Sequence, residues 1–306
     1  MDMQVRILHP SPFHKIVMFI YYFNPMKSGY NMSTKPKIIL LVSTINSSDY
    51  WELWTDRIYA MNPLPDLVIF AENNSWDNTI ENLINFKLPH EVIRVWFRED
   101  LDVPIWESMN EYLSICHIRQ LLITRARQLD PNYAIFLDDD VLPPKNLISE
   151  IVKSKKDLIG GYYYRNFPQG KWLCARFFTD NSEKKLMYVD DDWIRNYCPT
   201  IQPYKFVEGD YIRVYGTSAG CLALSRKILQ DNRLNFYPRP IEAKGASEDF
   251  GYCHKAKDYG YETWLHRYMR CFHIMDRGNF DRPWAVNPNG ELVPFKWRQD
   301  TRPSNL

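Results

Sequence analysis

Short apolar runs recur along the middle of the chain, separated by polar or amphipathic stretches. Each run is apolar almost throughout, which is typical of strands in a parallel sheet that is covered on both faces. The predicted strands are KIILLVST (37–44), DLVIFAENN (66–74), EVIRVWF (91–97) and YAIFL (133–137).

The stretches between these runs predict helices. The clearest covers 111–129, where apolar residues recur at steps of three and four and form one face. These residues are Ile115, Ile118, Leu122, Ala126 and Leu129. Shorter helices are expected within 48–61 and 75–86. Strands that alternate with helices predict an α/β, Rossmann-like fold with a mixed, mostly parallel central sheet flanked by helices.

Three consecutive aspartates, Asp138–Asp140, follow the strand 133–137. In such sheets ligands bind outside the carboxyl ends of the strands. Because side chains alternate along a strand, Asp138 and Asp140 are expected to point one way and Asp139 the other. Two converging carboxylates suit a hard divalent cation that holds a diphosphate in turn. A solvated acidic turn before Pro143 is the alternative.

Two further segments contain small or acidic residues. Asp190–Asp192 follow a charged, turn-like stretch and are interpreted as a surface or acceptor-side loop. Gly216, Ser218, Ala219 and Gly220 are small enough for a ligand to approach the backbone, although tight strand packing explains them equally well.

A helix is predicted to begin after Ser247, a good N-cap, and to end near Gly260. Glu248 and Asp249 fall in its first turn, where the helix dipole favours carboxylates. The following segment, 261–274, is strand-like and carries His273 near its end. A single histidine is more often structural than a ligand.

Composition narrows the class of protein. A chain of 306 residues with 45% hydrophobic content forms one large α/β domain or two closely joined ones. A net charge of +1 gives no electrostatic reason to expect nucleic acid as a partner. The aromatic share of 15% suits sugar binding or a well-filled core, and Trp172, Trp193 and Tyr215 are candidates for either role.

The six cysteines are scattered without a C-x-x-C pair, which favours a reducing compartment and a cytoplasmic protein. The apolar stretch 13–23 is shorter than the roughly 20 residues that span a bilayer. It is a strand, a peripheral membrane contact, or sequence upstream of a start at Met32. We treat 1–35 as an N-terminal extension of unknown role and 276–306 as a C-terminal tail, either a lid or added packing.

Taken together, these segments resemble the glycosyltransferases of the GT-A fold, specifically the inverting family two. The similar segments are KIILLVSTIN, IFAENNSWDNT, HIRQLLITRARQLDPNYAIFLDDDVLPP, YGTSAGCLALSRKIL and SEDFGYCHKAKDYGYETWLHRYMRCFHI. They span 37–274 in the order of the family. The resemblance divides this domain into a nucleotide-sugar-binding half, 36–165, and an acceptor-binding half, 166–275.

The resemblance implies a role for each matching residue. Asp249 matches the general base, and Asp140 with His273 matches the site of Mn²⁺ or Mg²⁺. The implied nucleotide-sugar contacts are Thr44, Asn73, Asn74, Arg119, Asp138, Asp139 and Glu248. Asn73 and Asn74 stand where the family usually has an aspartate and a small polar residue, so the identity of the base stays open.

The implied reaction moves a sugar from a nucleotide-diphosphate sugar to a hydroxyl on a glycan, a lipid-linked molecule or a protein. A retaining transferase of the same fold and a non-catalytic nucleotide-sugar or glycan-binding protein are the alternatives. A nucleotidyltransferase is disfavoured, because VSTINSSDYW after the first strand lacks the glycine and lysine of a phosphate-binding loop.

Overall fold

The computed structural model describes residues 18–23, 37–73, 75–97, 107–167, 170–173, 175–176, 207–237, 247–274, 284–286 and 292–294. Several residues singled out above lie outside these ranges: Asn74, Asp190–Asp192, Trp193 and most of 276–306. Trp172 lies within a described strand, but its side chain is outside the described part.

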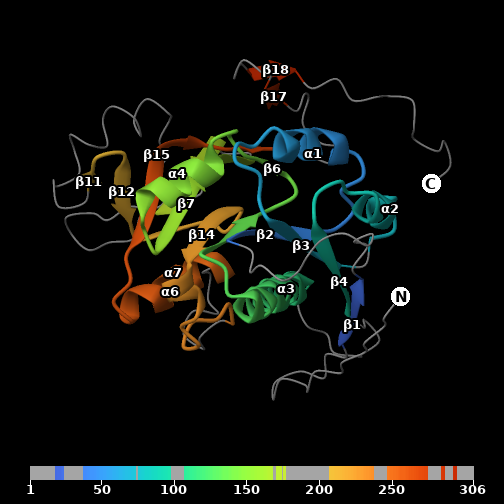
Figure 1. The fold of residues 1–306 in the computed structure, drawn as a ribbon, viewed down its shortest axis with the longest axis horizontal. Helices are drawn as coiled ribbons and strands as arrows, with labels where there is room; N and C mark the ends of the chain where they lie inside the picture. Colours follow the sequence, from blue (N-terminus) through green and yellow to red (C-terminus); the bar gives the residue numbers. More distant parts are fainter. Residues whose placement is uncertain are drawn as a thin grey trace.

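A 10-stranded sheet crosses the molecule in the order β1-β4-β3-β2-β5-β14-β7-β15-β12-β11 (Figure 1). The strands are β1 (Met18–Phe23), β2 (Ile38–Thr44), β3 (Leu67–Asn73), β4 (His90–Phe97), β5 (Tyr133–Leu137), β7 (Leu158–Tyr162), β11 (Val207–Glu208), β12 (Tyr211–Val214), β14 (Cys221–Ser225) and β15 (Thr263–Arg270). The series β4-β3-β2-β5 is parallel, as is the pair β7-β15. Strands β1, β14 and β12 run against their neighbours. Seven of the ten strands therefore run in the same direction, so the sheet is mixed and mostly parallel, as predicted.

Within the described ranges, four short ladders lie outside this sheet. They pair β6 (Val141–Leu142) with β16 (Phe272–His273), β8 (Tyr164–Phe167) with β9 (Gly170–Leu173), β10 (Ala175–Arg176) with β13 (Gly216–Thr217), and β17 (Trp284–Val286) with β18 (Leu292–Pro294). The first ladder is important for the site, because it joins the segment after the aspartates to the segment that carries His273.

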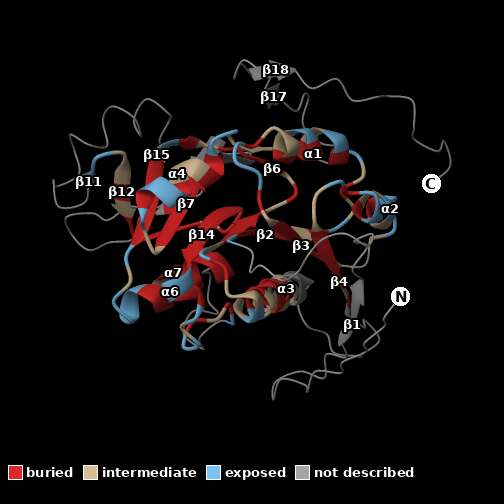
Figure 2. Cartoon of the chain, in the orientation of Figure 1, coloured by how far each residue is buried: buried red, intermediate tan, exposed pale blue. Residues whose placement is uncertain are grey.

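Helices cover both faces of the sheet (Figure 1). Helices α1 (Trp51–Tyr59), α2 (Thr79–Ile84) and α4 (Leu147–Ser154) lie on one face, and α3 (Glu107–Leu129), α6 (Arg226–Leu229) and α7 (Glu248–Asp258) lie on the other. Alternate residues of β2 enter the two cores: Leu40 packs with Trp54 of α1, whereas Leu41 packs with Leu122 of α3. Both cores are buried (Figure 2), which explains why the parallel strands are largely apolar.

The predicted apolar face of α3 is confirmed in most of its residues, whereas Ile115 is only half-buried. Ile118, Leu122 and Ala126 of α3 are buried against the sheet, and Leu129 packs beside them. Helix α7 begins after Ser247, and Gly260 has a φ of +85°, a left-handed conformation that only glycine adopts readily. The carboxylates of Glu248 and Asp249 are thereby fixed at the start of α7.

The N-terminal stretch 13–23 contains an edge strand, β1, that pairs with β4. This finding favours the strand interpretation of that stretch. Within the described ranges, no helix is long and apolar enough to cross a membrane.

Candidate active site

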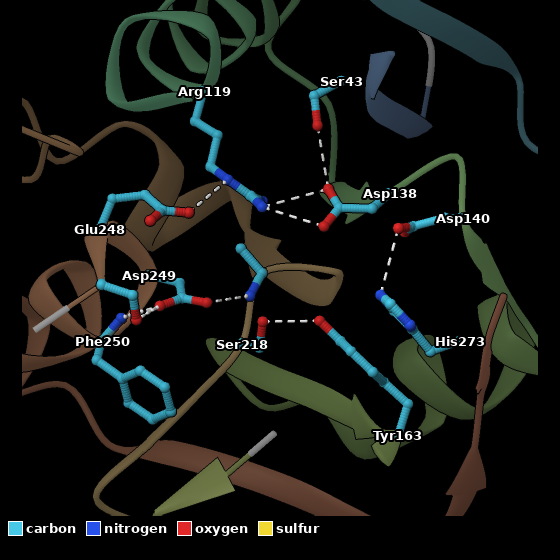
Figure 3. A network of polar contacts seen from close by, with 12 residues as sticks. Ser43, Arg119, Asp138, Asp140, Tyr163, Ser218, Glu248, Asp249, Phe250 and His273 are labelled. Carbon is cyan, nitrogen blue, oxygen red and sulfur yellow. Dashed lines mark hydrogen bonds and ion pairs between the residues drawn. The ribbon is translucent and has the colours of Figure 1, made fainter. Parts of the chain in front are cut away.

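Five segments bring polar side chains to one edge of the sheet. Strands β2, β5 and β7 end there, and β14, which runs the opposite way, begins there after Gly220. Strand β16 reaches the same edge through its pairing with β6. The side chains of Asp138, Arg119, Glu248, Asp140 and His273 gather at this edge (Figure 3).

Arg119 of α3 lies at the centre of this cluster and joins two carboxylates (Figure 3). Its Nη2 donates to both Oδ1 and Oδ2 of Asp138 at 3.2 Å, and its Nε forms an ion pair with Oε1 of Glu248 at 3.1 Å. The side chain of Arg119 is only 5% exposed. Strand β2 also contributes, because the Ser43 hydroxyl donates to Oδ1 of Asp138 at 3.1 Å.

The charge of Arg119 is stabilised by these neighbours. Burial alone would lower the pKa of the guanidinium, but the charges of Asp138, Glu248 and Asp249 outweigh it and raise that pKa. Its Nη1 is buried and has no hydrogen-bond partner among the described residues. A buried donor of this kind costs free energy unless a ligand satisfies it, so Nη1 marks a position for an acceptor group.

Asp140 and His273 form the second part of the cluster. Nε2 of His273 lies 3.2 Å from Oδ2 of Asp140, and the two side chains are 13% and 33% exposed. No group of three or more His, Cys, Asp or Glu side chains that could hold a metal occurs within the described ranges. Two protein ligands still fit Mg²⁺ or Mn²⁺, because such ions keep several waters and bind substrate phosphates.

The aspartates lie in a turn rather than in a continuous strand. Strand β5 ends at Leu137, and the N–H of Val141 donates to the carbonyl of Asp138 at 3.0 Å. Alternation along a strand was therefore the wrong reason to expect Asp139 to point away from Asp138 and Asp140, because the three residues lie in a turn. Asp139 nevertheless points away from the cluster and is buried against the hydroxyls of Thr44 and Ser47.

The side chains of Asp139 and Thr44 are both engaged in this buried contact. Burial raises the pKa of Asp139 well above its ordinary value, and the charge of Asp140 adds to the effect. The Thr44 hydroxyl also lies 2.9 Å from that of Ser47. Neither side chain faces open space, and their contact with a nucleotide stays a prediction.

Asp249 is held by three donors. Its Oδ1 accepts hydrogen bonds from the Ser247 hydroxyl and from the N–H of Phe250, the latter at 2.7 Å. Its Oδ2 accepts from the N–H of Ala219 at 3.2 Å. Because an ionised carboxylate has about four acceptor positions, one remains for a further donor such as a substrate hydroxyl.

Glu248 is buried beside these charges. Burial is the largest cause that raises its pKa to about 7, the charge of Asp249 adds to it, and Arg119 opposes it. The ordinary glutamate value is 4.5. Between these two values the folded chain keeps a proton that the unfolded chain has released, so this group's contribution to stability falls as the pH rises.

We expect the free energy of unfolding of the wild type, relative to Glu248→Gln, to fall by about 2 kcal/mol between pH 5 and pH 8. Glutamine cannot ionise, so the difference between the two proteins isolates the titration of Glu248. Urea unfolding of both proteins at both pH values measures it. A difference that stays constant with pH would contradict the assignment.

The remaining predicted contacts are less well defined. Oδ1 of Asn73 is buried without a hydrogen-bond partner among the described residues, which suits an acceptor aimed at a ligand. Tyr215 is 9% exposed and packs edge-on against His254 at 4.3 Å. This packing favours the core interpretation of Tyr215 over sugar stacking.

Sequence reasoning missed Ser43 and Tyr163 of the cluster, and it singled out Ser218 only as a small residue that lets a ligand approach the backbone. The Tyr163 hydroxyl lies 2.7 Å from that of Ser218, and the Tyr163 ring stacks on His273. Tyr163 directly follows β7, so its position at a strand end was the available signal. Its partners are far away in sequence and were not predictable from spacing.

The chain was compared with known proteins and solved structures. No family model matches it, and no curated protein matches it. GalNAc-T7 with UDP, GalNAc and Mn²⁺ is similar in structure, with a TM-score of 0.50, 11% identity, and 79% of this chain and 44% of that chain covered. GalNAc-T7 is a GT-A glycosyltransferase. The chain has the GT-A fold.

Two further GT-A structures were found at lower TM-scores. S. aureus TarS 1-349 in complex with UDP-GlcNAc gives 0.48, with 14% identity, 79% of this chain and 60% of that chain covered. The mannosyltransferase PcManGT from Pyrobaculum calidifontis, in complex with GDP-Man and Mn²⁺, gives 0.46, with 13% identity, 81% and 60% covered. The chain thus spans less than two thirds of these proteins. At this identity the likeness extends to the GT-A fold, and activity has to be argued from the site.

Proposed function

We propose that the chain is a glycosyltransferase that moves a sugar from a nucleotide-diphosphate sugar to a hydroxyl acceptor. The observation that carries this proposal is the buried Arg119, which joins Asp138 to Glu248 and has an unsatisfied Nη1. It lies at the carboxyl ends of the parallel strands, where open α/β sheets bind ligands. Arg119 is a cation with an unused donor, beside a further carboxylate, Asp140, and a histidine, His273. This combination suits a diphosphate with its metal ion.

Asp140 and His273 would hold the divalent cation, Mn²⁺ or Mg²⁺. When bound, such an ion neutralises the negative charge that builds on the leaving diphosphate. Arg119 adds a fixed positive charge on the same side. GalNAc-T7 and PcManGT were each solved with Mn²⁺, which supports a metal in this fold without identifying the ion used by this chain.

Asp249 is proposed as the general base. It accepts three hydrogen bonds in the first turn of α7, an arrangement that suits a carboxylate acting as a base. It would accept the proton of the acceptor hydroxyl as the oxygen attacks the anomeric carbon. A single displacement from the face opposite the diphosphate inverts that carbon.

Asn73, together with Asn74, is proposed to contact the base of the nucleotide. Both amide and carbonyl groups are available in these side chains, so the pair is compatible with uracil or guanine. TarS was solved with UDP-GlcNAc and PcManGT with GDP-Man, and both nucleotides are therefore worth testing. The acceptor class, a cytoplasmic location and membrane contact through 13–23 stay predictions.

The direct test is calorimetric titration with UDP and with GDP, each with and without Mn²⁺. We expect one nucleotide to bind only when Mn²⁺ is present, and Asp140→Ala to weaken that binding at least about tenfold. Asp56→Ala is the matched control, because Asp56 is exposed on α1. Folded protein that binds neither nucleotide would overturn the proposal.

Two observations would separate the alternatives. Nucleotide binding without turnover on any nucleotide sugar would indicate a binding protein. A product whose anomeric configuration equals that of the donor would indicate a retaining enzyme, and NMR of the product reads this directly.

A further inference from the structure

Tyr163 occupies a position between the two parts of the candidate site. It is 3% exposed, at the end of β7. Its hydroxyl lies 2.7 Å from the Ser218 hydroxyl, and its ring stacks on the His273 imidazole with centroids 5.6 Å apart and planes 4° from parallel (Figure 3). No role is assigned to Tyr163 by the proposed reaction.

The imidazole of His273 lacks the support that metal-binding histidines usually have. Such a histidine generally donates its second ring N–H to a carboxylate, a carbonyl or water, and this bond fixes the ring. Here Nε2 faces Asp140, whereas Nδ1 is buried with no hydrogen-bond partner in the described part of the chain. The stacking of the Tyr163 ring on His273 is therefore a contact that fixes the plane of the imidazole.

Tyr163 is itself firmly held. A Cβ at position 220 would clash with the Tyr163 hydroxyl and would lie 3.1 Å from Oδ2 of Asp138, so the hydroxyl sits directly against the Gly220 backbone. The carbonyl of Gly220 also accepts the N–H of Asp138 at 3.1 Å. The segment Ser218–Gly220 thus holds Tyr163 and Asp138 in fixed relation to each other.

We propose that Tyr163 is a positioning residue that holds the His273 imidazole in the orientation needed to bind the divalent cation. This inference rests on the proposed function. Tyr163 acts through its ring, which determines the plane of the imidazole, while its hydroxyl anchors that ring to Ser218. It contacts neither the metal nor the donor in this assignment.

The test measures Mn²⁺ affinity by the EPR signal of free Mn²⁺, in the presence of UDP and, separately, of GDP. Tyr163→Met removes the flat ring but keeps much of the volume, and we expect Mn²⁺ binding to weaken by about tenfold. Tyr163→Phe keeps the stacked ring and loses only the anchor to Ser218, so its Mn²⁺ affinity should fall by less than that of Tyr163→Met. Tyr211→Met is the matched control, since Tyr211 contacts another histidine, His266, at 5.2 Å outside the site.

A double-mutant cycle separates positioning from a general loss of structure. If Tyr163 acts through His273, Tyr163→Met should cost no further affinity in a His273→Ala background. An equal loss in both backgrounds, or no loss in the single variant, overturns the inference. Tyr163→Leu repeats the cycle if the methionine variant folds poorly by circular dichroism. Wild-type protein that binds no Mn²⁺ with either nucleotide instead overturns the proposed function, and this inference with it.

Discussion

Arg119→Met should lower the free energy of unfolding by about 3–5 kcal/mol. The guanidinium is 5% exposed and lies between Asp138 and Glu248, whose side chains are 23% and 9% exposed. Methionine fills a similar volume but leaves both carboxylates without their positive partner in a poorly hydrated site. Uncompensated buried charge of this kind is among the costliest single changes in a protein. Urea unfolding followed by circular dichroism measures the loss.

Two controls test the cause of this loss. Arg213→Met breaks an ion pair with Glu262 in which both side chains are well exposed, at 32% and 47%, and should cost less than about 1 kcal/mol. Adding Glu248→Gln to Arg119→Met removes one of the two stranded charges and should recover part of the stability. A double variant that is no more stable than Arg119→Met would contradict the electrostatic explanation.

The sequence was sufficient for the parts of the fold that depend on local pattern. Strands β2 to β5 were predictable because most of their described residues are buried, whichever face they point to, so that each strand contains a nearly continuous apolar run. The start of α7 was predictable because Ser247, Glu248 and Asp249 have side chains suited to a helix N-terminus. Both patterns involve residues that are close together in the chain.

The contacts that define the site were not predictable in this way. Arg119 is joined to Glu248 across more than a hundred residues, and its role in the sequence could be taken only from a resemblance. In the sequence Tyr163 is one aromatic residue among many, and only the structure places its ring on His273. The direction of the Asp139 side chain is set by a turn at the end of β5, where the alternation of side chains along a strand no longer applies. Pairings set by sheet topology leave no local trace.

Asp249→Asn should reduce turnover by about 10²–10⁴-fold while nucleotide binding changes little. Asparagine keeps one oxygen for the Ser247 and Phe250 donors but cannot take a proton at neutral pH. Its amide would also face the N–H of Ala219, where Oδ2 now accepts a bond, so a modest loss of stability is expected in addition. Release of UDP or GDP from the nucleotide sugar that binds, with water as the acceptor, measures the rate.

The comparison with Glu248→Gln decides which carboxylate carries the proton. Glu248, with a pKa raised to about 7, has the more favourable basicity near neutral pH, but its charge is engaged by Arg119. Asp249 accepts three hydrogen bonds, which leaves one of about four carboxylate acceptor positions for a substrate hydroxyl. If Asp249→Asn keeps most of the turnover and Glu248→Gln loses it, Glu248 is the base. If both lose turnover but only Glu248→Gln weakens nucleotide binding, Asp249 is the base and Glu248 acts through Arg119 on the donor.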